Sequence, residues 1–120
     1  MPMRFSLVIA SALVAGASFA ACGSDDGAER RVILITQTDE GCTPETIDLT
    51  AGEKVKFDVK NEGKKDREVE GVDGTKLEEV LVPSGKTRSL KYSAPKSAGS
   101  GKIKCYIPGG NTVFITLKVT

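Results

Sequence analysis

Polar and apolar residues alternate along much of this 120-residue chain after position 30. The clearest stretch covers residues 54–60, where Lys, Val, Lys, Phe, Asp, Val and Lys follow one another without a break. A period of two is typical of a β-strand with one buried face and one face in water. The same alternation, or a run of β-branched residues, predicts further strands at residues 32–35, 46–50, 68–72, 87–93, 102–106 and 113–119.

Turn-forming residues separate these segments at intervals of about 8–12 residues. Gly, Pro, Ser and Asn cluster at residues 83–85 and 108–111. Residues 76–82 fit either a strand or one helical turn, and no long helical pattern is convincing in the rest of the domain. The sequence therefore predicts an all-β domain, an antiparallel sandwich or barrel, in which Ile103 and Cys105 share one face.

The N-terminal segment has the features of an export signal. Arg4 supplies the positive start, and an uncharged, mostly apolar run follows it. Residues 19–22 (FAAC) resemble a bacterial lipobox, whose cysteine is acylated and becomes the mature N-terminus. We therefore expect residues 1–21 to be a lipoprotein signal peptide, residues 22–31 a flexible tether that starts at acylated Cys22, and residues 32–120 the folded domain. The alternative is an ordinary secretory signal with an incidental cysteine at position 22.

This signal also predicts where the protein works. A lipid on Cys22 would hold it to the membrane on the extracytoplasmic side of the cell envelope, so the membrane is one expected partner. Cys42 and Cys105 would then lie in an oxidising compartment, where thiols tend to pair. Nucleic acid is not an expected partner, because 17 Lys and Arg are balanced by 16 Asp and Glu.

The absence of histidine excludes several kinds of chemistry. Ser-His-Asp and Cys-His catalysis need an imidazole, and so does the two-histidine, one-cysteine site of blue copper proteins. The chain has many hydroxyl groups, but none has an evident base beside it. We therefore expect a protein that is not an enzyme.

Several short motifs resemble those of cupredoxin-like domains, and they occur in the same order. They are residues 47–57 (IDLTAGEKVKF), 83–87 (PSGKT) and 104–109 (KCYIPG), followed by a final strand. The resemblance spans about residues 32–119. It implies a Greek-key antiparallel β-sandwich, a fold in which many members carry copper for electron transfer.

The copper ligands of that family are largely missing here. Its copper-binding members have a histidine after the third strand, where this chain has residues 66–68 (DRE), and another after the cysteine, where it has Gly109 and Gly110. The axial methionine is also missing, since both methionines lie in the expected signal. Cys105 alone is kept, so the chain cannot build a type 1 copper site.

The chain resembles most closely the EfeO-type cupredoxin-like domains of periplasmic iron-uptake proteins. The shared features are an added cysteine in residues 41–44 (GCTP), a Glu-x-Glu in residues 68–70 and an acidic pair at Glu78 and Glu79. The resemblance implies a site for ferric iron or copper. Its candidate ligands are Cys42, Cys105, Glu68 and Glu70, with Glu78 and Glu79 as further candidates.

Each candidate also has a simpler interpretation. Cys42 and Cys105 could form a disulfide across a loop of about 63 residues, which the chain-entropy model values at about 4 kcal/mol. They could instead be a metal-binding or redox-active pair, or two separate buried thiols. Glu68 and Glu70 share one face of a strand, which is either the face of Cys105 or the solvated one. The alternative function is thus a non-catalytic structural or interaction module stabilised by the disulfide. Residues 64–67 (KKDR) are interpreted as a solvated turn.

Overall fold

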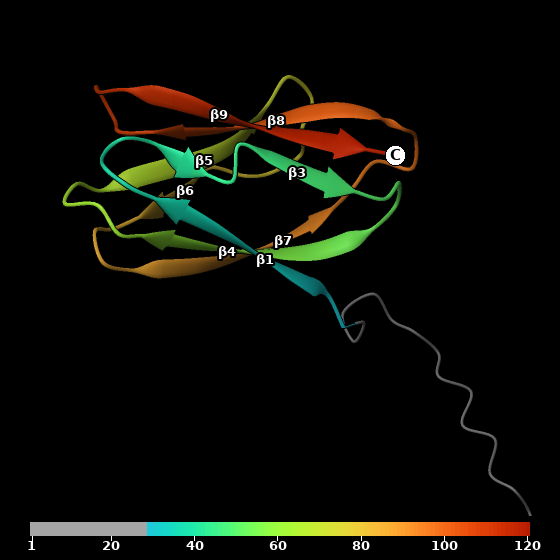
Figure 1. The fold of residues 1–120 in the computed structure, drawn as a ribbon, viewed down its shortest axis with the longest axis horizontal. Coiled ribbons are helices and arrows are strands. Elements are labelled where there is room, and N and C mark those ends of the chain that lie inside the picture. Colours follow the sequence, from blue (N-terminus) through green and yellow to red (C-terminus); the bar gives the residue numbers. More distant parts are fainter. Residues whose placement is uncertain (1–28) are drawn as a thin grey trace, which may run out of the picture.

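Residues 29–120 are described by a computed structural model, in which nine strands form two sheets packed face to face (Figure 1). The expected signal peptide, the lipobox and Cys22 lie outside these residues. No helix long and apolar enough to cross a membrane occurs between residues 29 and 120. The strands are β1 (Arg31–Gln37), β2 (Cys42–Thr43), β3 (Thr46–Leu49), β4 (Lys54–Asn61), β5 (Arg67–Val72), β6 (Val80–Val82), β7 (Thr87–Ser93), β8 (Gly99–Tyr106) and β9 (Thr112–Val119).

The two sheets have the strand orders β2-β1-β4-β7 and β3-β9-β8-β5-β6. The predicted all-β sandwich is confirmed, but the prediction that it is antiparallel is wrong for two pairs. β1 runs parallel to β4, and β3 runs parallel to β9. The chain leaves the first sheet after β2, forms β3 in the other sheet and returns as β4, so β4 arrives beside β1 in the same direction.

Three segments differ in detail from the prediction. β1 begins at Arg31, the last residue of the expected tether, and the Arg30 guanidinium hydrogen-bonds the carbonyl oxygens of Val55 and Tyr92. The ambiguous segment 76–82 contains the short strand β6 and no helical turn. β8 begins at Gly99, because small residues at its start continue the pairing with β9.

The alternation predicted for residues 54–60 forms the centre of the core. Val55, Phe57 and Val59 are fully buried on β4, and they face Ile103 and Cys105 of β8, which are fully buried too. The rings of Phe57 and Tyr92 stack at 5.5 Å between centroids. Burial of these side chains from both inner faces holds the sheets together, as expected for a sandwich.

Gly71 is the position where the β5–β6 connection approaches the sheet most closely. Its N–H donates to the carbonyl oxygen of Leu77 at 2.9 Å, and a Cβ placed on Gly71 would lie 2.1 Å from the carbonyl oxygen of Thr75. A side chain here would therefore force backbone atoms apart.

We expect Gly71→Ala to lower the free energy of unfolding by about 1–3 kcal/mol, the usual range for overpacking in a filled site. Urea unfolding measures this change through the midpoint at constant slope. Gly99→Ala is the matched control, since nothing lies within 4 Å of a Cβ there. Equal unfolding midpoints for the two variants would contradict this prediction, because they would show that the β5–β6 connection can move aside at no cost in stability.

Candidate functional site

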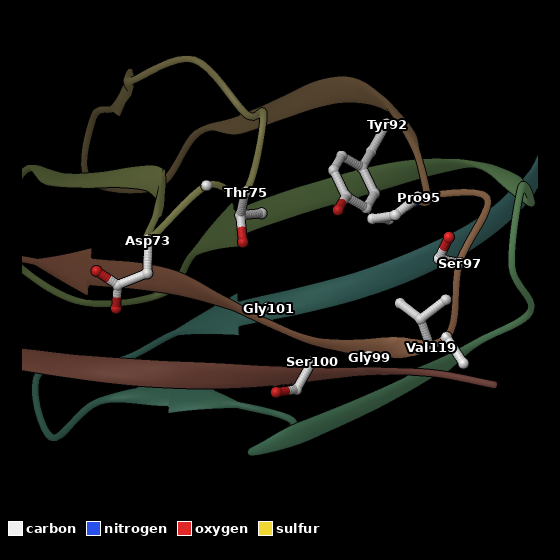
Figure 2. A pocket seen from close by; sticks show the side chains of 11 residues that line it. Asp73, Thr75, Tyr92, Pro95, Ser97, Gly99, Ser100, Gly101 and Val119 are labelled. Atoms are coloured by element: carbon white, nitrogen blue, oxygen red, sulfur yellow. The ribbon is translucent and has the colours of Figure 1, made fainter.

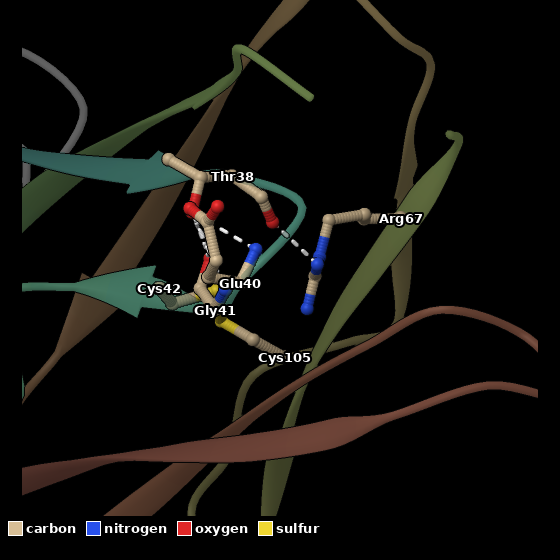
Figure 3. Close-up of a disulfide and its surroundings, with 6 residues drawn as sticks. All are labelled: Thr38, Glu40, Gly41, Cys42, Arg67 and Cys105. Carbon is tan, nitrogen blue, oxygen red and sulfur yellow. Dashed lines mark hydrogen bonds between the residues drawn. A yellow bond between two sulfur atoms is a disulfide. The ribbon is translucent and has the colours of Figure 1, made fainter. Parts of the chain in front are cut away.

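A disulfide joins Cys42 to Cys105 across the two sheets (Figure 3). Cys42 lies on the edge strand β2, and Cys105 lies on β8 inside the opposite sheet, with 6.5 Å between their Cα atoms. Cys105 is 0% exposed, whereas Cys42 is partly exposed. Of the three arrangements considered for this pair, the structure has the disulfide.

A tight turn between β1 and β2 places Cys42. The Thr38 N–H donates to the carbonyl oxygen of Gly41 at 2.8 Å, and the Thr38 hydroxyl oxygen accepts from the N–H groups of Glu40 and Gly41 at 3.3 Å. Such hydroxyl–backbone bonds are typical of threonine in turns. Cys42 therefore pairs with Gln37 of β1, at the edge of the sandwich.

The turn is also held from the side by the loop that follows β4. A carboxylate oxygen of Asp39 accepts from the Lys64 N–H at 2.9 Å. Asn61 shapes this loop, since its side-chain amide donates to the carbonyl oxygens of Lys65 and Val82 at 2.8 and 2.9 Å. The turn that carries the disulfide is thus anchored to the rest of this end of the sandwich.

The structure places Glu68 and Glu70 on the other side of the sheet from Cys105. Val69 is the cross-strand partner of Cys105, and both are fully buried. Because side chains alternate along a strand, Glu68 and Glu70 point outward from β5. Glu70 pairs there with the Lys104 ammonium at 3.6 Å.

Tyr106 is the centre of an acidic cluster on this outer face. Its hydroxyl donates to a carboxylate oxygen of Glu79. The carboxylates of Glu68 and Glu79 raise the pKa of the Tyr106 phenol, so it stays protonated and acts as a donor. Glu78 is exposed and lines a surface groove with Ser89 and Lys91 of β7.

The candidate metal ligands are therefore not brought together. Cys42 and Cys105 are bonded to each other between the sheets, and Glu68 and Glu70 lie outside. Within residues 29–120, no three Cys, Asp or Glu side chains are arranged so that they could hold a metal ion.

Arg67 is the residue that the sequence interpretation missed. It was expected in a solvated turn, and the three residues before it are exposed, but Arg67 is 0% exposed. It begins β5 and points inward in phase with Val69, which is the signal that could have revealed it. Figure 3 shows its side chain reaching toward the disulfide, where Nη1 donates to the carbonyl oxygen of Thr38.

The remaining donors of Arg67 have no partner. Nε and Nη2 are buried without a hydrogen bond, and so are both polar atoms of the buried Gln37 amide. Burial lowers the pKa of the Arg67 guanidinium, and the Asp39 carboxylate partly offsets this effect. Arginine nevertheless stays charged in proteins. This end of the sandwich therefore encloses a cation with unused donors.

These residues do not fit a type 1 copper ion. The chain has no imidazole, the sulfur of Cys105 is engaged in the disulfide, and a guanidinium already supplies positive charge nearby. A copper site of that type needs two imidazoles and a thiolate around the metal.

A cavity of about 260 Å³ lies at the opposite end of β8 from the disulfide (Figure 2). Gly99 and Val119, which pair at that end, line it together with Tyr92 and several hydroxyl side chains. Burial raises the pKa of the Tyr92 phenol. Gly99 lies six residues before Cys105 on β8, which corresponds to about 20 Å along a strand. The cavity is therefore separate from the disulfide.

The sequence profile of the cupredoxin-like domain family matches residues 8–116. The chain therefore belongs to the cupredoxin-like domain family. None of the curated protein sequences matches it significantly.

Several solved structures are similar in fold. Auracyanin B aligns with a TM-score of 0.61 and 15% identity, over 75% of this chain and 88% of that one. A reduced auracyanin from the photosynthetic bacterium Roseiflexus castenholzii aligns with a TM-score of 0.59 and 12% identity, over 78% of this chain and 99% of that one. The apo form of a copper binding protein aligns with a TM-score of 0.56 and 18% identity, over 78% of this chain and 92% of that one. At these identities the likeness shows the sandwich fold alone.

We expect the Cys42–Cys105 bond to be found in the unreduced protein. Trypsin would release it as a cross-linked pair of peptides, residues 32–54 and 105–118. Alkylation under denaturing conditions before digestion should leave both cysteines unlabelled. Labelled Cys42 and Cys105 peptides in similar yield would contradict the bonded pair.

Removal of the bond with Cys42→Ala/Cys105→Ala should lower the free energy of unfolding by about 4 kcal/mol, because the closed loop restricts the unfolded chain. Urea unfolding of this variant, and of the wild type with and without reductant, measures the effect. A Cys22→Ser variant serves as the control and should unfold as the wild type does.

Proposed function

We propose that this chain is a lipid-anchored, extracytoplasmic cupredoxin-like domain that acts as a non-catalytic structural or interaction module. The observation that carries the proposal is the covalent Cys42–Cys105 link beside the buried Arg67. The thiol that copper-binding relatives would use is bonded to another sulfur. The charge balance and the lipobox-like segment support a membrane-tethered protein rather than a nucleic-acid-binding one.

Electrostatics also supports a module without bound metal at this end. A cation approaching the sulfurs would meet the Arg67 guanidinium, whose charge is poorly screened because it is buried. Asp39 offsets part of that charge, and its carboxylate already accepts a backbone hydrogen bond from Lys64. This arrangement favours an anion, and it disfavours a metal ion.

The second candidate function is binding of iron or copper through Cys42, Cys105, Glu68 and Glu70. It is supported by the resemblance to EfeO-type domains and by a copper binding protein among the structural neighbours. Ferric iron would favour the glutamate oxygens, and Cu(I) the thiolates. The disulfide would have to be reduced for the thiolates to take part.

Metal titration distinguishes these two functions. We expect the unreduced protein, in a Cys22→Ser background, to bind neither Cu(I), Cu(II) nor Fe(III) stoichiometrically by equilibrium dialysis, because the sulfurs are bonded and the glutamates lie outside. The matched variant is Glu68→Gln/Glu70→Gln. Stoichiometric binding by the unreduced protein that this variant loses would reject the proposed module and establish the metal site.

Lipid anchoring depends on Cys22. In a bacterial host fed an alkyne-tagged fatty acid, the wild type should take up the tag and sediment with membranes, whereas Cys22→Ala should do neither. The Cys42→Ala/Cys105→Ala variant is the control and should still carry the tag. An untagged, non-sedimenting wild type would show that the N-terminal segment is an ordinary secretory signal.

A further inference from the structure

We propose that Cys42–Cys105 is a redox-active disulfide that exchanges with an external dithiol, and that Arg67 stabilises the thiolate formed at Cys105. The inference rests on the oxidised pair that also supports the proposed function. It is independent of the lipid anchor and of the nature of any protein partner. Three observations carry it: the unequal exposure of the two cysteines, the register of β5 against β8, and the unused donors of Arg67.

Only one end of the disulfide is accessible from outside. Cys42 lines a surface groove between the turn that precedes β2 and the strand β9, with Glu45, Val113 and Phe114 among its walls. Cys105 is 0% exposed and does not line the groove. A thiolate that attacks a disulfide must approach one sulfur directly, so Cys42 is the sulfur that it reaches and Cys105 is the leaving group.

The sheet register places Arg67 next to that leaving group. Val69 is directly opposite Cys105, so Arg67, two residues earlier on the same inward face of β5, is the diagonal neighbour of Cys105. Diagonal neighbours in an antiparallel pair are about 7–8 Å apart, within reach of a long side chain. In Figure 3 the Arg67 side chain points toward Thr38 and the two cysteines, and its guanidinium reaches the Thr38 carbonyl oxygen.

Two donors of Arg67 lack an acceptor while the disulfide is intact, and the Asp39 carboxylate offsets its charge only in part. Nε and Nη2 are buried donors without an acceptor, and a neutral disulfide is at best a weak one. A thiolate at Cys105 would accept from these donors in a charge-assisted hydrogen bond, the strongest kind in proteins. Arg67 therefore stabilises the reduced state more than the oxidised state.

The exchange balances in two steps. A thiolate of the external dithiol attacks the Cys42 sulfur, the Cys42–Cys105 bond breaks, and its electron pair leaves on Cys105 as a thiolate beside Arg67. The second thiol of the reductant then loses its proton and attacks the mixed disulfide, so that Cys42 leaves as a thiolate and takes up a proton. The domain gains two electrons, and the dithiol is oxidised to a disulfide.

The equilibrium constant for reduction tests the role of Arg67. Full-length protein in a Cys22→Ser background is equilibrated with graded mixtures of reduced and oxidised dithiothreitol at pH 7, and the peptides 32–54 and 105–118 are scored for alkylation. We expect Arg67→Met to shift the equilibrium at least tenfold toward the disulfide, about 30 mV for this two-electron couple. Arg67→Lys, which keeps the charge, should shift it less than Arg67→Met does.

Arg88→Met is the matched control, since Arg88 is exposed on β7 in the other sheet. It should leave the equilibrium unchanged, while urea unfolding of the oxidised variants reports any loss of fold separately. An Arg67→Met protein that folds and has the wild-type equilibrium, or a more easily reduced disulfide, would overturn the assignment of Arg67.

A second experiment, on protein that keeps both cysteines, shows which of the two sulfurs an external thiolate attacks. Brief treatment of the folded, oxidised protein with glutathione, followed by acid quenching, should place glutathione on residues 32–54, which contain Cys42. Glutathione found mainly on residues 105–118 would overturn the proposed direction of exchange. Metal binding by the unreduced protein would reject the proposed function instead, so the two failures are distinguishable.

Discussion

The covalent link between the sheets determines the arrangement of the whole end of the sandwich that contains it. β2 is only two residues long and pairs with β1 through two positions, so backbone pairing contributes little to holding it. The bond from Cys42 to Cys105 fixes it instead to the inside of the opposite sheet. The turn before β2 is then held in place, and the Thr38 carbonyl of this turn is the acceptor for Arg67.

The two ends of the interior differ in character because of this arrangement. The middle of the sandwich is a continuous apolar core around Phe57 and Ile103, whereas the disulfide end contains Gln37, Asn61 and Arg67. Asn61 is fully engaged, but the amide of Gln37 and part of the guanidinium are not. Buried polar groups without partners destabilise a fold by about 1–3 kcal/mol each. A sandwich that tolerates them at one end concentrates its instability next to its disulfide.

The sequence predicted the strands better than their partners. Alternation in residues 54–60 identifies the buried face of β4, because a half-buried strand must alternate. It contains no information on direction, so the parallel pairing of β1 with β4 and of β3 with β9 was not predicted. The prediction that Ile103 and Cys105 share a face is also confirmed, since both are buried and it too rests on alternation along a strand.

The candidate site was predictable only in part. The family resemblance selected the two cysteines, and the structure joins them. Glu68 and Glu70 do not lie beside the two cysteines. Val69 is the residue opposite Cys105, so the register places both glutamates on the outer face of β5. Arg67 was missed because it follows three exposed polar residues, and charged residues are rarely buried unless paired.

The pairing of β3 with β9 also sets the order in which the chain can fold. β9 comes about 70 positions after β3, so a chain that emerges from its N-terminal side cannot complete the β3 pairing until β9 has followed. Cys42 likewise waits as a thiol while the 63 positions up to Cys105 are added. During that interval the cysteine available to it is Cys22, twenty positions earlier in the sequence. Acylation of the Cys22 sulfur, as we propose, would remove this wrong partner and leave Cys42 to pair with Cys105.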